Sequence, residues 1–206
     1  MSRLFGHHHP LGGLKFCGCS VLPETFALPP GGGASAPAKR KVSVAGRVAR
    51  VIDTHAHCLF QESLDLMGAQ APSLLPPTKG VPEHFLRQSD PLKTRLQDMD
   101  AMGVDMQVLS VNPFWYPKDR DTAQAICKIN NECLAELVAQ HPRRFAAFAS
   151  LCMQFPELAV QQLEHAVKKL GLVGAAIGGS VAGRDFCHPE YHPVLDRKST
   201  RLNSSH

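Results

Sequence analysis

Two histidines two positions apart, His55 and His57, are the residues whose types and spacing most directly indicate chemistry. They close the heptapeptide VIDTHAH (51–57), after an apolar run and Asp53. Alternate side chains of a β-strand point to the same face, so both imidazoles, and Asp53 with them, are expected on one face. Imidazole nitrogens bind zinc and other transition metals, but a zinc site needs further ligands. The sequence therefore predicts part of a metal site, with His55 and His57 as ligands and Asp53 as a supporting polar residue.

Other histidines and cysteines favour simpler roles. The triplet at 7–9, with Cys17 and Cys19, fits a solvated leader with adventitious metal affinity better than a built site. His188 and His192 are four positions apart and could form a ligand pair on a helix. The proline that follows each of them favours a role at the start of a helix instead.

The elements that must position the paired histidines alternate along the chain. Apolar stretches typical of strands buried on both faces are followed by segments with helical spacing of apolar residues. Strands are predicted at 51–55, 105–111, 145–150 and 173–178, and helices at 92–103, 121–141 and 156–171, with a further helix starting within 188–196. This alternation predicts right-handed β–α–β units and a parallel sheet, hence an α/β fold.

Three regions differ in composition. Residues 1–48 are expected to be a flexible leader, rich in Gly, Pro and His, with no packed face in its first 40 residues and a short hairpin around Ala45-Gly46. Residues 49–196 form the predicted α/β body. Residues 197–206 lack apolar periodicity and resemble translated sequencing-adapter sequence, so they are expected to be a non-native tail that does not continue the preceding helix.

Charge and composition narrow the functional class. Residues 1–50 hold seven Lys or Arg and one acidic residue, whereas the rest of the chain holds 15 basic and 17 acidic residues. The body is thus mildly acidic, which argues against nucleic acid as a partner. No apolar run reaches the ~20 residues of a membrane span. Seven scattered cysteines fit reduced thiols and a cytoplasmic location.

Several segments together resemble the amidohydrolase-related family, of the aminocarboxymuconate-semialdehyde decarboxylase type. They are VIDTHAH, RLQDMDAMGVDMQVLSV, the long stretch from INNECLAEL to LVGAAIGG, and HPEYHPVL, in that order over about residues 50–196. The resemblance implies a (β/α)₈ barrel, which typically needs ~250 residues. The sequence therefore predicts the N-terminal half of a TIM barrel, made of its first four β–α units.

The resemblance also implies a site. His55 and His57 would be ligands of a divalent metal, zinc by expectation, while a further histidine, an aspartate and a catalytic histidine would come from later strands. An arginine would hold the substrate carboxylate, and Arg87 and Arg95 lie in the right region without aligning cleanly. Because loops after barrel strands build active sites, Trp115 in NPFWYP has either a substrate contact or a packing role.

The function that these expectations favour is a metal-dependent carboxy-lyase acting on a small unsaturated or aromatic carboxylic acid. The alternative within the superfamily is a metal-dependent hydrolase of an amide, ester or lactone, and the alternative of another class is a non-catalytic fragment. The 206-residue chain is expected to be inactive alone and to bind zinc weakly, because half of the site is missing. A homodimer is the assembly expected of the full-length protein.

Overall fold

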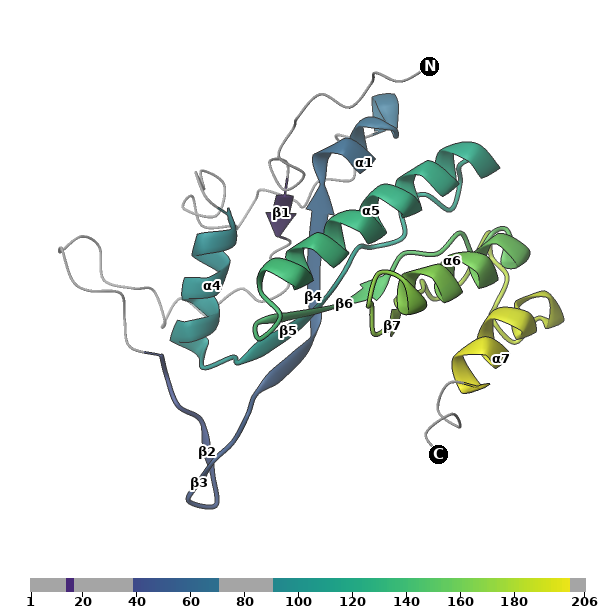
Figure 1. Cartoon of the computed structure of the whole chain (residues 1–206). Coiled ribbons are helices and arrows are strands. Elements are labelled where there is room, and N and C mark those ends of the chain that lie inside the picture. Colours follow the sequence, from purple (N-terminus) through teal and green to yellow (C-terminus); the bar gives the residue numbers. More distant parts are fainter. Residues whose placement is uncertain (1–13, 17–38, 71–90, 201–206) are drawn as a thin grey trace.

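The computed structural model describes residues 14–16, 39–70 and 91–200, as an α/β arrangement of one main sheet with helices packed on it (Figure 1). Its elements are β1 (Leu14–Phe16), β2 (Ser43–Val44), β3 (Arg47–Val48), β4 (Ile52–Phe60), α1 (Gln61–Asp65), η3 (Gly68–Gln70), α4 (Pro91–Met102), β5 (Met106–Ser110), α5 (Arg120–Gln140), β6 (Phe145–Ala149), α6 (Pro156–Lys168), β7 (Gly174–Ala175), η4 (Pro189–Tyr191) and α7 (His192–Thr200).

The main sheet has the order β1-β4-β5-β6-β7, and the four strands from β4 to β7 are parallel neighbours. Each parallel step crosses over through at least one helix, as parallel pairing requires. The predicted parallel order is therefore confirmed. The strand ends differ from the prediction, because β4 continues to Phe60 and β7 is only two residues long.

The helices begin and end at residues whose chemistry explains the boundary. Asp119 caps α5, since its carboxylate accepts a hydrogen bond from the backbone N–H of Thr122 at 3.0 Å. Proline occupies the first turn of α6, where its missing N–H costs nothing. Gly103 and Gly171 follow α4 and α6 with φ of 77° and 73°, the left-handed conformation that glycine adopts readily at a helix end.

The two faces of the sheet are packed differently. We call the face toward which Gln107, Leu109 and Phe145 point the covered face, because Arg95 of α4 donates to Gln107 there and the ring of His141, at the end of α5, packs against Phe145. All three side chains are at most 1% exposed. We call the opposite face, which holds His57 and Phe148, the histidine face. Register places Phe148 there, since directly paired residues of neighbouring strands share a face.

One expectation about the leader is wrong at a specific place. Leu14–Phe16 forms β1, which pairs antiparallel with Cys58–Phe60 of β4. Leu14 is buried in the core, and the ring of Phe16 stacks on Phe145 with centroids 6.3 Å apart. Part of the leader thus does form a packed face. The remaining leader up to residue 38 lies outside the described residues.

The hairpin predicted around Ala45-Gly46 is confirmed. Strands β2 and β3 pair antiparallel, and Ala45 and Gly46 both have positive φ, 49° and 76°. Positive φ at both central residues is the geometry of the two-residue turn that matches strand twist. The hairpin is exposed, and no large side chain of it joins the core.

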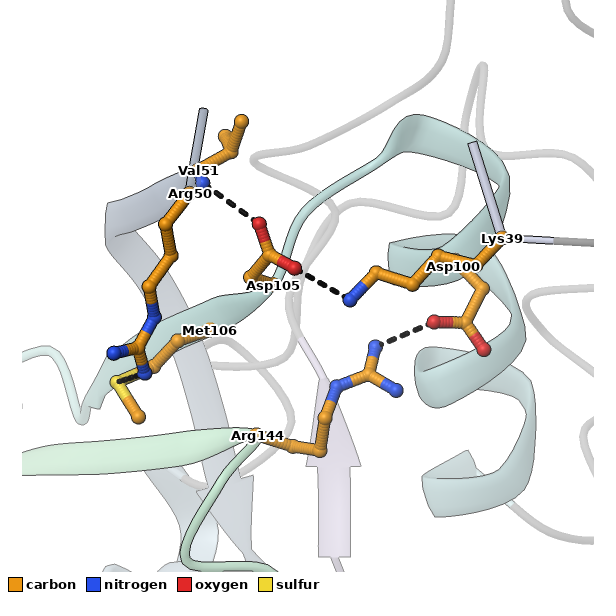
Figure 2. A network of polar contacts seen from close by, with 7 residues as sticks. All are labelled: Lys39, Arg50, Val51, Asp100, Asp105, Met106 and Arg144. Carbon is orange, nitrogen blue, oxygen red and sulfur yellow. Dashed lines mark hydrogen bonds and ion pairs between the residues drawn. The ribbon is translucent and has the colours of Figure 1, made fainter. Parts of the chain in front are cut away.

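A polar network joins the segment around this hairpin to the rest of the fold (Figure 2). Asp105 accepts hydrogen bonds from Lys39 Nζ at 2.5 Å and from the backbone N–H of Val51 at 2.8 Å. Beside it, Arg144 pairs with Asp100 at 2.9 Å. These contacts connect the approach to β4 with the end of α4 and the start of β5 and β6. They therefore fix where β4 begins. We call β4 the histidine strand, because it carries His55 and His57.

The C-terminal helix was predicted to stop near Asp196, but the helical backbone of α7 continues to Thr200. Residues 201–206 lie outside the described residues. Within the described parts of the chain, no helix combines the length and the apolar character that crossing a bilayer demands.

Candidate metal centre

His55 and His57 converge, as the spacing predicted. Their Nε2 atoms are 3.1 Å apart, and the ring centroids are separated by 4.8 Å with the planes at 78°. Nitrogens that each lie ~2.1 Å from one ion, at roughly 90–110° to each other, are separated by about 3.0–3.4 Å. The observed spacing therefore suits two ligands of a single divalent ion.

The other ring nitrogen of His57 is held by the neighbouring strand. Ser110, the last residue of β5, has its Oγ 2.8 Å from His57 Nδ1. If Nε2 bound a cation, the Nδ1–H would donate to this hydroxyl, which would fix the tautomer and the ring orientation. Burial, followed by the neighbouring His55, lowers the pKa of His57, so its neutral, metal-binding form is favoured.

Contrary to the prediction from strand alternation, Asp53 does not share a face with the histidines, because an irregularity in β4 turns its side chain to the other face. Asp53 pairs with Gln107, and His57 pairs with Ser110, with a register shift between Asp53 and Ala56. Four residues of β4 thus match three of β5, so Asp53 lies on the covered face and His57 on the histidine face. Strand alternation alone had placed both on one face.

Asp53 supports the site through hydrogen bonds. One carboxylate oxygen accepts from Gln107 Nε2 at 2.8 Å, and the other accepts from the backbone N–H of His55 at 3.0 Å. Gln107 Oε1 in turn accepts from Arg95 Nε at 2.7 Å. The chain of contacts from α4 to β4 therefore holds the irregular part of the strand in place.

Arg95 was predicted as a substrate-carboxylate contact, and the structure corrects this. Its side chain is 4% exposed, it points at Gln107, and its guanidinium lies over the Phe16 ring at 5.1 Å. A buried arginine engaged in this way positions other residues and does not face a ligand. The second candidate, Arg87, lies outside the described residues.

For Trp115, the structure favours packing over the substrate contact that was the alternative. The indole is fully buried, and its Nε1–H donates to the carbonyl oxygen of Leu151 at 2.9 Å. Its own carbonyl accepts from Gln154 at 3.0 Å. The next residue, Tyr116, accepts a hydrogen bond from Gly178 N, and burial raises the pKa of Tyr116 to about 12. The loop after β5 is thus hydrogen-bonded to the segments that follow β6 and β7.

The described residues do not complete a ligand set. Within residues 14–16, 39–70 and 91–200, no group of three or more His, Cys, Asp or Glu side chains is placed to hold a metal ion. His188 occupies the N-cap position of η4 without a side-chain capping hydrogen bond, and its Nδ1 lies 3.5 Å from a carboxylate oxygen of Glu190. This position agrees with its predicted place at a helix start. The histidines at 7–9, with Cys17 and Cys19, lie outside the described residues.

Sequence reasoning missed Ser110 and Gln107. Each is a polar residue within an otherwise apolar strand, MQVLS, and both are buried. A buried polar side chain requires a hydrogen-bond partner. That requirement was the available signal, because each of the two residues has a hydrogen-bond partner on β4, Asp53 for Gln107 and His57 for Ser110.

Parallel β–α units with converging histidines on the first of the parallel strands define a protein of the metal-dependent barrel class. The chain belongs to the amidohydrolase family, whose model matches residues 52–198. The solved structures of similar proteins are about twice as long as the matched part, so the described sheet corresponds to the first half of a barrel.

Curated relatives are decarboxylases. The chain is 41% identical over 120 residues to gamma-resorcylate decarboxylase of Polaromonas sp., covering 57% of this chain and 37% of the relative. It is 34% identical over 104 residues to 2-amino-3-carboxymuconate-6-semialdehyde decarboxylase of Dictyostelium discoideum, covering 50% and 29%. The chain therefore spans about a third of the length of the curated relatives it matches.

A solved structure extends the comparison. Dihydroxybenzoic acid decarboxylase from Polaromonas sp. JS666 is 30% identical with a TM-score of 0.57, and the match covers 73% of this chain and 46% of that one. That structure contains manganese and the inhibitor 2-nitroresorcinol. The expectation of a divalent metal thus agrees with this relative, and the metal there is not zinc.

Proposed function

We propose that this chain supplies the histidine strand of a metal-dependent decarboxylase that acts on a small aromatic or unsaturated carboxylic acid. The observation that carries the proposal is the Nε2–Nε2 distance of 3.1 Å between His55 and His57, with Ser110 behind His57. The similarity to decarboxylases of gamma-resorcylate and of aminocarboxymuconate semialdehyde supports the reaction class. The chain spans only part of these relatives, so activity is proposed for a protein that carries a full ligand set.

Each described residue has a proposed task. His55 and His57 would hold the cation, Ser110 would orient His57, and Asp53 with Gln107 would fix the backbone at His55. A bound divalent cation would supply Lewis-acid stabilisation of negative charge on the substrate's oxygens. The remaining ligands and the proton donor are proposed to come from outside the described residues.

The metal is proposed to be divalent, with zinc and manganese as the two candidates. Imidazole ligands suit zinc. The structure of the Polaromonas relative contains manganese, a harder ion, which supports manganese as the second candidate. Carboxylate or water ligands from other parts of the protein would favour manganese. Measuring the affinity of the protein for each of the two metals distinguishes between them.

The first test titrates the 206-residue chain with Zn²⁺ and Mn²⁺ by calorimetry. We expect weak binding, because two imidazoles fall short of the three protein ligands of a catalytic zinc site. His55→Ala and His57→Ala should remove this binding. His165→Ala, at an exposed histidine of α6, is the matched control and should leave it unchanged. Binding that survives both strand variants would overturn the assignment of His55 and His57.

The second test concerns the reaction. The reading frame that encodes this chain, expressed to its stop codon beside the 206-residue chain, is assayed for carbon dioxide release from 2,6-dihydroxybenzoate and from aminocarboxymuconate semialdehyde. We expect turnover by a product with the full ligand set and none by the 206-residue chain. Turnover by the 206-residue chain, lost in His57→Ala, would refute the need for further ligands.

Two other functions remain candidates for specific reasons. The family also fits a hydrolase of an amide, ester or lactone, so a panel of such substrates is run in the same assay. A non-catalytic role fits the two-histidine ligand set of the described residues. Hydrolysis without carbon dioxide release would favour the first, and tight metal binding without any turnover would favour the second.

The remaining proposals concern setting and assembly. A cytoplasmic location follows the scattered cysteines, and the mildly acidic body supports a protein that binds neither nucleic acid nor membranes. A homodimer is proposed for the longer protein. Light scattering on the product of the complete reading frame tests the dimer, and a monomer would contradict it.

A further inference from the structure

Two cysteines outside the candidate metal centre lie in direct contact. The sulfurs of Cys127, in the middle of α5, and Cys152, just beyond β6, are 3.4 Å apart. Both side chains are fully buried. Both cysteines are free thiols, and the proposed decarboxylase chemistry uses neither of them.

Hydrogen bonds beside the two cysteines hold their sulfurs close together. Asn131 lies four residues after Cys127, on the same side of α5, and Ser150 lies two residues before Cys152. Asn131 donates to the Ser150 carbonyl at 3.0 Å and accepts from the Ser150 N–H at 2.7 Å. This paired hydrogen bond fixes the strand end against the helix, so the contact between the thiols is maintained by a second, independent interaction.

The two thiols have different surroundings. Gln162 of α6 donates its amide N–H to Cys152 Sγ at 3.2 Å, and its oxygen accepts from the Cys152 backbone N–H at 2.8 Å. Contact with Cys127, then this amide, lowers the pKa of Cys152 despite burial, whereas burial raises the pKa of Cys127. Cys152 is therefore the better nucleophile of the pair.

The side chain of Gln162 lies between Cys152 and a cavity. A cavity of about 220 Å³ lies between α5 and α6, and Gln162, Gln124 and Asn131 are among its lining residues. The side chain of Gln162 thus borders the cavity on one side and contacts the sulfur on the other. Access of a molecule the size of hydrogen peroxide from the cavity to the sulfur requires this side chain to rotate.

We propose that Cys127 and Cys152 form a peroxide-sensitive dithiol that closes to an intramolecular disulfide. The Cys152 thiolate attacks one oxygen of hydrogen peroxide, the O–O bond breaks, and hydroxide leaves, which gives a sulfenic acid. The Cys127 sulfur then attacks the Cys152 sulfur, the S–S bond forms, the S–O bond breaks, and water leaves with the thiol proton. Two thiols are oxidised to one disulfide, and peroxide is reduced to two water molecules.

The cross-link would act on the carboxyl end of β6. Leu151, next to Cys152, accepts the indole hydrogen bond of Trp115 from the loop after β5. A disulfide would therefore tie α5 to the segment that positions this loop. It would also constrain the unfolded chain between the two cysteines, which raises stability.

The test uses the full chain with hydrogen peroxide, followed by alkylation and trypsin digestion without reductant. Cleavage after Arg120, Lys128, Arg144 and Lys168 isolates Cys127 and Cys152 on peptides 121–128 and 145–168, and neither contains another cysteine. We expect these two peptides to appear as one species that has lost two hydrogen atoms. The unfolding midpoint should rise by about 5 °C or more and return to its starting value with dithiothreitol.

Matched variants on α5 make the outcome specific. Cys127→Ser should abolish the linked species and leave Cys152 as a sulfenic acid, which dimedone labels on the 145–168 peptide. Cys133→Ser, at the other buried cysteine of α5, should leave the cross-link intact. The proposal fails if peroxide oxidises the exposed Cys187 while Cys127 and Cys152 both remain reduced. It also fails if Cys152 links to another cysteine as readily as to Cys127.

Discussion

The surroundings of β6 and those of β4 are stabilised by different means. Around β6, apolar side chains from α5 and α6 cover the strand, and Phe145 is 1% exposed. Around β4, the first strand residue, Ile52, is 49% exposed, and the strand is fixed by Asp53, Gln107 and Asp105 through hydrogen bonds. The difference shows that the first part of β4 is oriented mainly by polar contacts, which are directional. The end of β4, where Ala56 and Cys58–Phe60 are buried, gains stability from apolar burial, as β6 does.

The largest effect is expected from apolar truncation on the covered face of β6. Phe145→Ala should lower the free energy of unfolding by about 3–5 kcal/mol, because it leaves a cavity in the core. Phe148→Ala removes the same ring from the same strand on the histidine face, where it is only partly buried, and should cost about 1–2 kcal/mol. Urea unfolding of the two variants measures the difference, and equal losses would contradict the two-face description.

A second pair of variants compares two fully buried side-chain amides, Gln107 and Asn130. Gln107→Leu removes hydrogen bonds to Asp53 and Arg95 and should cost about 3 kcal/mol, since both partners are charged. It should also weaken metal binding at His55, whose N–H the Asp53 carboxylate holds.

Asn130→Leu is the control for this change. The Asn130 side chain is fully buried, and within the described part of the chain neither of its amide atoms has a hydrogen-bond partner. Replacing it should change stability by less than about 1 kcal/mol or increase it. Urea unfolding measures the loss of stability in both variants. A loss in Asn130→Leu as large as that in Gln107→Leu would show that the hydrogen bonds of Gln107 do not account for its effect.

A third pair of variants compares Gly103 and Gly171, the glycines that follow α4 and α6. An alanine at either position must adopt positive φ, which costs about 1–2 kcal/mol. At Gly103 its Cβ would also lie 3.0 Å from the Arg40 carbonyl oxygen and from Val42, whereas at Gly171 it would meet nothing within 4 Å. Gly103→Ala should therefore be the more destabilising in thermal unfolding. Equal losses would mean that the segment before β4 moves aside freely.

The smallest effect is expected at two carboxylates near the surface, the partly exposed Asp105 and the exposed Glu157. The Lys39 ammonium, then the Val51 N–H, lower the pKa of Asp105, so its stabilising contribution is present above its ordinary pKa and is lost as the pH falls through the lowered one. Asp105→Asn should reduce the loss of stability on acidification below about pH 4 and increase proteolysis at residues 39–51. Glu157→Gln on α6, whose carboxylate pairs with Arg120, should leave that proteolysis unchanged. Identical proteolysis in both variants would argue against the network as the anchor.

Sequence patterns predicted the elements well and the side-chain directions less well. Apolar runs and helical spacing indicated the order of β4 to β7 because burial on both faces leaves a strong signal. The turn of Asp53 away from the histidines was not predictable, since an irregular strand looks regular in sequence. The short β1 strand in a Gly- and His-rich leader gave no periodic signal. The burial of Trp115 and Arg95 depends on contacts with residues distant in sequence, such as Leu151 and Phe16.

The short strand β1 has a consequence for how this sheet can grow. It occupies the backbone of β4 at Cys58–Phe60, on the side opposite β5, and leaves the earlier part of β4 without a strand on that side among the described residues. A strand that arrived there to close a barrel would have to stop short of Cys58 or displace Leu14–Phe16. The leader thus acts as a competitor for one edge, and the edge formed by β7 has no such competitor among the described strands. Among the described strands, β7 thus leaves its outer edge unpaired over its whole length, whereas the outer edge of β4 is unpaired only before Cys58.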